Sequence, residues 1–341
     1  MQYRMLGRTG VEVSTQCLGT MMFGRLGNPD HADCERIVHR ALDAGINFID
    51  TADVYSGGES EEILAGALKG RREDVVLATK VFNPMSRARN HRGGSRRWIV
   101  RAAEDSLRRL DTDHIDLYQV HRLDWDTALD ETLGALTDLV HSGKVLYLGS
   151  SSYPAEWILE AQWVSASRGR ERFVCEQPQY SIFARSAEAA VLPTCQRHEM
   201  AVIPWSPLAG GWLTGKYRRG EQVPTGSRFS GQNSWAPRPQ DLSSDPRLDL
   251  VERLAKVAEK AGLPMTQLGL GFVANHPAVT STIIGPKNMV QLDELLAAAD
   301  VTLDADTLDA IDGIVPPGTD AAGIEHYVNN PALEKKARRR S

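Results

Sequence analysis

Four polar residues have the types and the order that proton delivery to a carbonyl group requires. Asp50, Lys80 and His121 each follow a short apolar run, and Tyr55 comes five residues after Asp50. An ammonium at the end of a buried run needs a carboxylate partner, which Asp50 can supply to Lys80. A cation beside a tyrosine stabilises the phenolate, so the pKa of Tyr55 is expected to be lowered. These features predict Tyr55 as a general acid and His121 as a hydrogen-bond donor or proton relay.

Each of these residues also has an ordinary structural interpretation. A tyrosine in a loop usually packs, an aspartate after a strand often caps a turn, and a lysine that ends a strand is commonly exposed. A histidine taken alone is more often structural than catalytic. The four residues nevertheless fall at three successive strand ends, and independent coincidences multiply, which favours the catalytic interpretation.

The elements that must position these residues alternate between strand and helix. After a predicted N-terminal hairpin at 2–5 and 11–13, short apolar runs typical of buried parallel strands occur at 16–19, 46–49, 75–79, 115–119, 145–149, 173–176, 201–204 and 282–284. Apolar residues between the runs recur at helical spacing, for example Ile99, Ala102, Ala103, Leu107 and Leu110. This pattern predicts an α/β fold, a (β/α)8 TIM barrel, with polar residues at strand ends facing the active site. A doubly wound sheet is the competitor, but the G-x-G-x-x-G motif typical of its dinucleotide site does not occur.

Two segments do not fit the simple repeat. Residues 207–246 are rich in glycine and proline, which predicts a long loop after strand seven on the active-site face. A short helix is expected near 304–312, followed by an irregular C-terminal extension after about 315 that closes over the substrate. We expect residues 1–341 to form a single barrel domain.

Composition excludes several classes of protein. The chain has 341 residues, 42% of them hydrophobic and 24% charged, which is typical of a globular protein and not of disorder, collagen or a coiled coil. A net charge of -5 gives no reason to expect nucleic acid or an anionic membrane as a partner. The basic tail at 335–340 is interpreted as solvated.

Cysteine spacing and apolar runs bear on localisation. No run approaches the length of a membrane span or the apolar core of a signal peptide. The four cysteines are widely spaced and form no C-x-x-C pair, which suits buried thiols in a reducing compartment: Cys17, Cys34, Cys175 and Cys195. A cytoplasmic protein is therefore expected, and its oligomeric state, including a homo-oligomer, stays open.

Other catalytic motifs are missing from the sequence. It has no H-E-x-x-H, no G-x-S-x-G and no Walker A motif, and its histidines do not cluster with cysteine or glutamate at metal-ligand spacing. No metal is therefore expected.

Several motifs together resemble the aldo-keto reductase family. They are the segments 47–55 and 58–61, the strand end 78–80, and 116–121, which agree in order and spacing over residues 1 to about 315. The segments 177–180 and 207–211 are most similar to the bacterial branch related to aryl-alcohol dehydrogenases and potassium-channel β subunits. The resemblance implies a (β/α)8 barrel whose catalytic tetrad is Asp50, Tyr55, Lys80 and His121.

The resemblance also implies NADP(H) as the cofactor, bound in an extended pose without a Rossmann fold. The residues that it assigns to the cofactor are Gly19, Thr20, Met21, Asp50, Ser151, Ser152, Gln177, Trp205, Ser206, Leu208, Gly210, Lys216, Gly285, Lys287, Asn288 and Gln291. Ser151, Ser152 and Gln177 would hold the nicotinamide carboxamide, and Trp205 would stack on the ring. Ser152 replaces the more common asparagine, and a hydroxyl cannot reproduce the paired contacts of an amide.

The phosphates of the cofactor are assigned to two segments. Ser206, Leu208, Gly210 and Lys216 would line the pyrophosphate, largely through backbone amides. A 2′-phosphate would contact Lys287 and Asn288, which favours NADP over NAD, and Gln291 would face the adenine. A lysine makes a point-charge contact and not a bidentate one.

The substrate pocket is assigned to six residues: Met22, Phe23, Tyr55, Phe82, His121 and Trp125. The aromatic residues favour an aryl or otherwise apolar aldehyde, and a keto-sugar intermediate stays open. The sequence thus predicts reversible, NADPH-dependent reduction of an aldehyde or ketone. Two alternatives remain: a non-catalytic, NADP(H)-sensing partner protein like the channel β subunits, and a barrel aldolase that forms a Schiff base on Lys80.

Overall fold

Eight parallel strands form one curled sheet in this computed structural model, which describes residues 1–224, 227, 245–321 and 331. The order is β10-β3-β4-β5-β6-β7-β8-β9. The strands are β3 (Gln16–Gly19), β4 (Phe48–Asp50), β5 (Val76–Val81), β6 (Ile115–Val120), β7 (Val145–Ser151), β8 (Phe173–Gln177), β9 (Ala201–Val202) and β10 (Thr282–Ile284). Hydrogen bonds from Thr280 N to Val202 O (2.8 Å) and from Ile283 N to Pro204 O (3.1 Å) join the two edges, so the sheet closes as a barrel.

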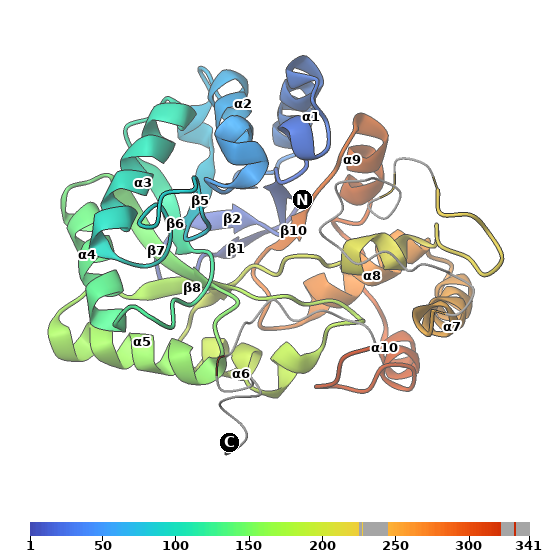
Figure 1. The fold of residues 1–341 in the computed structure, drawn as a ribbon. Helices are drawn as coiled ribbons and strands as arrows, with labels where there is room; N and C mark the ends of the chain where they lie inside the picture. Colours follow the sequence, from blue (N-terminus) through green and yellow to red (C-terminus); the bar gives the residue numbers. More distant parts are fainter. Residues whose placement is uncertain (225–226, 228–244, 322–330, 332–341) are drawn as a thin grey trace.

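Helices cover the outside of the sheet, as Figure 1 shows. One helix follows each strand: α1 (His31–Asp43), α2 (Glu59–Ala67), α3 (Arg96–Leu110), α4 (Leu129–His141), α5 (Ala155–Arg168), α6 (Val191–Arg197), α8 (Met265–Asn275) and α9 (Met289–Leu296). Two helices are additional, α7 (Arg247–Lys260) before α8 and α10 (Ala305–Asp312) after α9. Short 3₁₀ helices lie at Gly24–Leu26, Tyr55–Gly58, Arg72–Asp74, Ser186–Ala189 and Ala209–Thr214.

Side-chain caps define where several helices begin. The carboxylate of Asp30 accepts from Asp33 N ahead of α1, and Asp304 accepts from Thr307 N ahead of α10. The hydroxyl of Ser95 accepts from Trp98 N and fixes the start of α3. Such caps satisfy backbone amides that have no partner inside the helix.

The interior of the barrel is apolar at its amino end. The N-terminal hairpin of β1 (Tyr3–Met5) and β2 (Glu12–Ser14) closes this end. Leu6 and Val13 are fully buried there, in one cluster with Cys17, Phe48, Ala78, Leu117, Val174, Cys175, Ala201, Ile203 and Ile283. The guanidinium of Arg4 donates to the carbonyls of Ala274 and Val279 and ties the hairpin to the barrel.

The structure confirms the predicted barrel, the hairpin and every strand, with small differences in strand length. The ladder of β9 ends after Val202, two residues short of the prediction, although Ile203 N still donates to Glu176 O and Trp205 N to Pro178 O. The helix predicted near 304–312 is α10. Residues 225–226 and 228–244 of the predicted loop at 207–246, and most of the C-terminal extension with the basic tail at 335–340, lie outside the described residues. Closure of that extension over the substrate stays a prediction.

We expect Leu6→Ala to destabilise the protein by about 2–5 kcal/mol, because it removes a large side chain from a closed apolar space. Met5→Ala is the matched control, since Met5 is 51% exposed, and it should change the unfolding free energy by less than about 0.5 kcal/mol. Urea unfolding of both variants measures the difference. Equal losses would show that the hairpin does not plug the barrel.

Candidate active site

Strand register brings the predicted residues together at the carboxyl end of the barrel. Gly19 pairs with Asp50, Lys80 with Gln119, and Ser151 with Gln177. A Cβ at Gly19 would lie 2.6 Å from Cγ2 of Ile283, so only glycine allows this approach of β3 and β10. Parallel strands end on the same side of the sheet, which explains why residues far apart in sequence meet here.

A buried ion pair forms the centre of the site. Lys80 Nζ donates to Asp50 Oδ2 at 2.5 Å, to Thr51 O at 2.7 Å and to the hydroxyl of Tyr55 at 3.3 Å. The side chain of Lys80 is fully buried and that of Asp50 is 3% exposed. All three protons of the ammonium therefore have acceptors, as a buried charge requires.

The ionisation of this pair follows from its surroundings. Burial alone would lower the pKa of Lys80, but the negative charge of Asp50 and the hydrogen bonds to Asp50 and Tyr55 raise the pKa above its usual value. Lys80 is therefore a stable cation.

The expected lowering of the Tyr55 pKa is wrong in net direction. Burial raises the pKa of Tyr55, Lys80 lowers it, and Asp50 raises it again, so the pKa lies above the ordinary value for tyrosine. The sequence identified the neighbouring cation but not the extent of desolvation. Tyr55 accordingly keeps its proton at neutral pH and can donate it.

Two glutamines that point into the barrel complete the shell around Asp50. Its second oxygen, Oδ1, accepts from Gln119 Nε2 at 3.0 Å and from Gln177 Nε2 at 2.8 Å. The two amides are linked by a further hydrogen bond of 3.1 Å. Gln119 was not predicted from the sequence as a site residue, although a glutamine inside an apolar strand indicates a buried polar contact. Gln177 is thus engaged with Asp50, in addition to its assignment to the cofactor.

His121 lies beside Tyr55 as a neutral imidazole. The two rings meet edge to face with centroids 5.9 Å apart. Burial, with Lys80 and Arg122 as nearby cations, holds the pKa of His121 well below its usual value. A neutral imidazole carries one proton, so its tautomer decides which nitrogen can donate.

Asn83 determines which nitrogen of His121 carries that proton. Its amide nitrogen Nδ2 is 3.0 Å from His121 Nδ1. An amide N–H donates, so Nδ1 accepts and the proton resides on Nε2. Asn83 was not predicted from the sequence, because a single asparagine after a strand carries no distinctive pattern.

A turn after β7 gathers the residues assigned to the carboxamide. Ser151 Oγ donates to Gln177 O at 3.0 Å, and Trp205 Nε1 donates to Ser152 Oγ at 3.3 Å. Arg122 Nη1 lies 3.4 Å and 3.3 Å from these two hydroxyls and 2.6 Å from His121 O. Ser152 has a φ of 56° in this turn, a left-handed conformation.

Glu176 supports the same turn from beneath. It is fully buried and accepts from Ser150 Oγ at 2.5 Å and from Tyr153 N at 3.1 Å. Burial raises the pKa of Glu176 from 4.5 to about 7, against the hydrogen bonds and Arg122, which lower it. Glu176 was also missed from the sequence.

Asp53, in the segment after β4, carries another buried carboxyl group close to Lys80. Asp53 N donates to Lys80 O at 3.2 Å, and neither side-chain oxygen of Asp53 has a hydrogen-bond partner. Burial and the charge of Glu61 raise the pKa of Asp53 well above its usual value, although Arg109 lowers it. Glu61 is engaged with Thr79 and Arg109.

The segment after β9 is a left-handed turn beside Lys216. Ser206, Ala209, Gly210 and Gly211 have positive φ angles of 59°, 48°, 69° and 101°. Ser206 Oγ accepts from Gly210 N, and a Cβ at Gly211 would lie 2.7 Å from the ammonium nitrogen of Lys216. The amides of Ala209 and Gly211 donate within the segment, to Ser206 O at 2.9 Å and to Leu208 O at 2.8 Å.

Residues near the start of α9 have structural contacts of their own. Asn288 Oδ1 caps the helix by accepting from Gln291 N, and Gln291 Oε1 accepts from Lys287 N at 2.8 Å. Gly285 is exposed, with no atom closer than 3.9 Å to an added Cβ. The side chain of Lys287 is half-buried, and these contacts involve only its backbone.

The residues assigned to the substrate differ in their surroundings. Met22, Phe82 and Trp125 are partly exposed, and Trp125 packs edge to face on Trp157. Phe23 is fully buried in the core between the sheet and α1 and α2. Its burial gives the substrate assignment of Phe23 no support.

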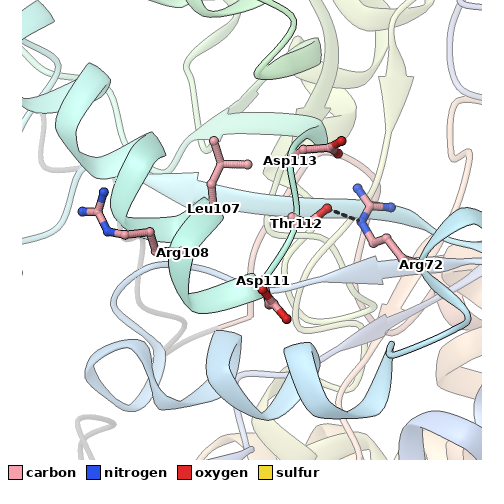
Figure 2. Close-up of a pocket in the computed structure, with 6 residues that line it drawn as sticks. All are labelled: Arg72, Leu107, Arg108, Asp111, Thr112 and Asp113. Atoms are coloured by element: carbon pink, nitrogen blue, oxygen red, sulfur yellow. Dashed lines mark hydrogen bonds between the residues drawn. The ribbon is translucent and has the colours of Figure 1, made fainter.

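A surface hollow of about 610 Å³ lies at the opposite, amino end of β5 and β6 (Figure 2). It is lined by Arg72, Leu107, Arg108, Asp111, Thr112 and Asp113. Arg72 donates to Thr112 Oγ1 and to Asp116, and Arg108 pairs with Asp105, so its guanidinium groups are engaged. The hollow is separate from the ion pair and has no proton donor like Tyr55.

The described part of the chain contains neither a metal-binding cluster nor a membrane-spanning helix. Within residues 1–224, 227, 245–321 and 331, no three histidine, cysteine, aspartate or glutamate side chains are placed to hold a metal ion. No helix in these ranges has the length and apolar character needed to span a membrane.

Fold and side chains define the class of protein, a (β/α)8 barrel with a buried Asp–Lys–Tyr cluster at the carboxyl ends of its strands. A family model described as the aldo/keto reductase family matches residues 16–316. The protein named "Uncharacterized oxidoreductase YrpG" from Bacillus subtilis is 38% identical over 330 residues, 93% of this chain and 97% of that protein. The chain belongs to the aldo/keto reductase family.

Two other relatives carry different names. A probable voltage-gated potassium channel subunit beta from Arabidopsis thaliana is 37% identical over 309 residues, 88% of this chain and 92% of that protein. A putative aryl-alcohol dehydrogenase from Saccharomyces cerevisiae is 30% identical over 326 residues, 87% of this chain and 92% of that protein. These relatives match the branch that the sequence motifs indicated.

We expect Asn83→Asp to move the proton of His121 from Nε2 to Nδ1 and to raise the pKa of His121, because a carboxylate accepts from Nδ1 and stabilises imidazolium. Two-bond ¹H–¹⁵N NMR of histidine-labelled protein reports the tautomer, with His121→Gln to assign the signal. Asn90→Asp, on an exposed residue of the same loop, is the control. A wild-type His121 with its proton on Nδ1 would contradict the assignment.

Proposed function

We propose that this protein reduces an aldehyde or ketone to the alcohol with NADPH, with Tyr55 as the general acid. The observation that carries the proposal is the contact of Lys80 with both Asp50 and Tyr55, which fixes a protonated phenol beside a permanent cation. Membership of the aldo/keto reductase family and an oxidoreductase-named relative support the reaction class.

The residues present fit a nicotinamide dinucleotide. The turn with Ser151 and Ser152 offers hydroxyls near Trp205, and Lys216, beside the left-handed segment at 206–211, offers a cation for a pyrophosphate. Lys287 would contact a 2′-phosphate. When bound, the reduced nicotinamide supplies the hydride that reaches the carbonyl carbon.

The protein's own residues supply the proton and orient the carbonyl. His121 Nε2–H and the hydroxyl of Tyr55 would both donate to the carbonyl oxygen and polarise it. As negative charge develops on that oxygen, the proton moves to it from Tyr55. Lys80 stabilises the phenolate that remains, and Asp50 with Gln119 and Gln177 keeps Lys80 in place.

Aromatic side chains at the entrance favour an aryl or apolar aldehyde as substrate, with a keto-sugar intermediate as the other class. Phe82 and Trp125 are partly exposed and follow β5, which contains Lys80, and β6, which directly precedes His121. They could pack against a flat, apolar substrate body.

A non-catalytic role as an NADP(H)-sensing partner is the second candidate. The channel-subunit relatives favour it. A complete proton-donating cluster favours catalysis instead, and steady-state NADPH oxidation with a panel of carbonyl compounds decides between the two roles.

Schiff-base chemistry on Lys80 fits the geometry poorly. A nucleophilic amine must be neutral, whereas the contacts of Lys80 raise its pKa and occupy all three of its protons. Borohydride trapping with a carbonyl substrate should leave Lys80 unmodified.

We expect Tyr55→Phe to lower kcat by about 10²–10⁴-fold, the usual contribution of a general acid, while the Kd for NADPH changes by less than about twofold, well under the tenfold that 1.4 kcal/mol would give. Tyr3→Phe, a phenol on the hairpin at the other end of the barrel, is the control and should keep wild-type kcat. NADPH oxidation and quenching of protein fluorescence measure the two quantities. Wild-type kcat in Tyr55→Phe would rule out the mechanism.

Lys287→Met should raise the Kd for NADPH about tenfold, because it removes roughly 1.4 kcal/mol of interaction with the 2′-phosphate, and should leave the Kd for NADH unchanged. Lys256→Met, on an exposed lysine of α7, controls for loss of charge. Fluorescence titration with both dinucleotides is the measurement. Equal weakening for NADPH and NADH would contradict the assignment of Lys287.

A further inference from the structure

The segment from 84 to 97, between β5 and the first turn of α3, carries concentrated positive charge. Between Asp74 and Glu104 the sequence has one lysine, six arginines and no acidic residue. Four of these arginines are exposed, and no residue in the described ranges forms an ion pair with any of them: Arg87, Arg89, Arg92 and Arg97. We call this segment the basic loop. Its charge contrasts with the net charge of -5 of the chain.

The basic loop lies at the entrance of the candidate active site. Asn83, directly before it, contacts His121 at 3.0 Å. Gly94 N donates to Asp124 Oδ2 at 2.7 Å, in the segment that follows β6. The same oxygen of Asp124 also accepts from Thr127 Oγ1. Two further acidic residues, Glu131 and Asp138, face the loop and pair with Arg96. The loop therefore borders the strand ends that carry Lys80 and His121.

The basic loop is a folded turn, so the backbone that carries its arginines has a defined course. Met85 N donates to His91 O at 3.1 Å, and Ser86 Oγ lies 2.8 Å from His91 Nδ1. The ring of His91 stacks on Trp98, with centroids 5.1 Å apart. Gly93 N donates to Phe82 O at 2.7 Å and closes the base of the loop.

The assigned cofactor phosphates do not account for this charge. In the order of the eight strands, β5 is fourth and β9 is eighth, so they lie on opposite sides of the closed barrel. The segment assigned to the pyrophosphate follows β9, and Lys287 follows β10. The positive charge of the basic loop, on the side of the barrel that carries His121, is thus available to the carbonyl substrate.

We propose that the physiological substrate is an anionic carbonyl compound, one with a carboxylate or phosphate group, and that Arg87, Arg89 and Arg92 attract this group to the active-site entrance. The inference rests on the proposed carbonyl reduction and names its substrate class. Like charges gathered at a cleft raise the local concentration of a substrate of opposite charge, and the effect weakens as salt screens it. Arg122, beside His121, adds a cation on the same side.

The test compares 4-formylbenzoate with its neutral methyl ester, which share the reacting aldehyde. Wild-type protein should have the higher kcat/KM for the acid. In Arg87→Gln/Arg89→Gln/Arg92→Gln, kcat/KM for 4-formylbenzoate should fall at least about fivefold through KM, within the range of electrostatic steering. The value for the ester should stay within about twofold, because a neutral substrate feels little of this field.

Salt and a matched variant provide the controls. Raising the ionic strength from about 20 to 300 mM should lower kcat/KM for the acid in wild type and not in the triple variant, since it shortens the screening length. Lys69→Gln/Arg168→Gln/Arg197→Gln removes the same charge from exposed residues at the amino end of the barrel and should behave as wild type. The same comparison of kcat/KM between glyceraldehyde 3-phosphate and glyceraldehyde shows whether the protein prefers a phosphate or a carboxylate group on its substrate.

A binding measurement separates this inference from the proposed function. Calorimetry with 4-formylbenzoate and its ester, on protein saturated with NADP⁺, needs no turnover. If the protein shows no turnover but binds the acid more tightly than the ester, and the triple variant loses this difference in affinity, the proposed reaction is wrong and the anion preference is supported. Equal kcat/KM and equal affinity for acid and ester, or equal losses for both in the triple variant, would overturn the proposal.

Discussion

The buried pair of Lys80 and Asp50 is the constraint on which the rest of the site depends. Removing two charges from water costs several kcal/mol for each ion, and their attraction offsets this only when the remaining hydrogen bonds are satisfied. Here Thr51, Tyr55, Gln119 and Gln177 satisfy them. These partners come from the segment after β4, from the 3₁₀ helix Tyr55–Gly58, and from β6 and β8. The charge at the centre therefore requires polar residues from several parts of the barrel. The amino end of the barrel has no such charge and is filled with apolar side chains.

The sequence predicted the features that depend on local pattern. Apolar runs predicted the strands. Asp50, Lys80 and His121 come at or just after the ends of those runs, and parallel strands end on one side of the sheet, so these three residues could be predicted to lie together. Gln119, Asn83 and Glu176 escaped prediction, since their roles depend on strand register and on contacts with residues 69, 38 and 26 positions away.

The predicted direction of the Tyr55 pKa shift was wrong for a related reason. Sequence shows which charges are close but not how much water is excluded, and desolvation is the largest influence on this phenol. The position of Phe23 could not be derived either, because a residue after a strand can turn toward the core or toward the entrance. The core of this barrel extends between α1 and α2 and includes it.

The buried carboxyl group of Glu176 links folding to proton uptake. A glutamate in the unfolded chain ionises near 4.5, whereas burial brings the pKa of Glu176 to about 7 in the folded protein. Between these values, folding takes up a proton at this residue. The contribution of Glu176 to stability is therefore complete below about pH 4.5 and is lost as the pH rises through about 7. The turn that presents Ser151 and Ser152 thus rests on a group that becomes charged near neutral pH.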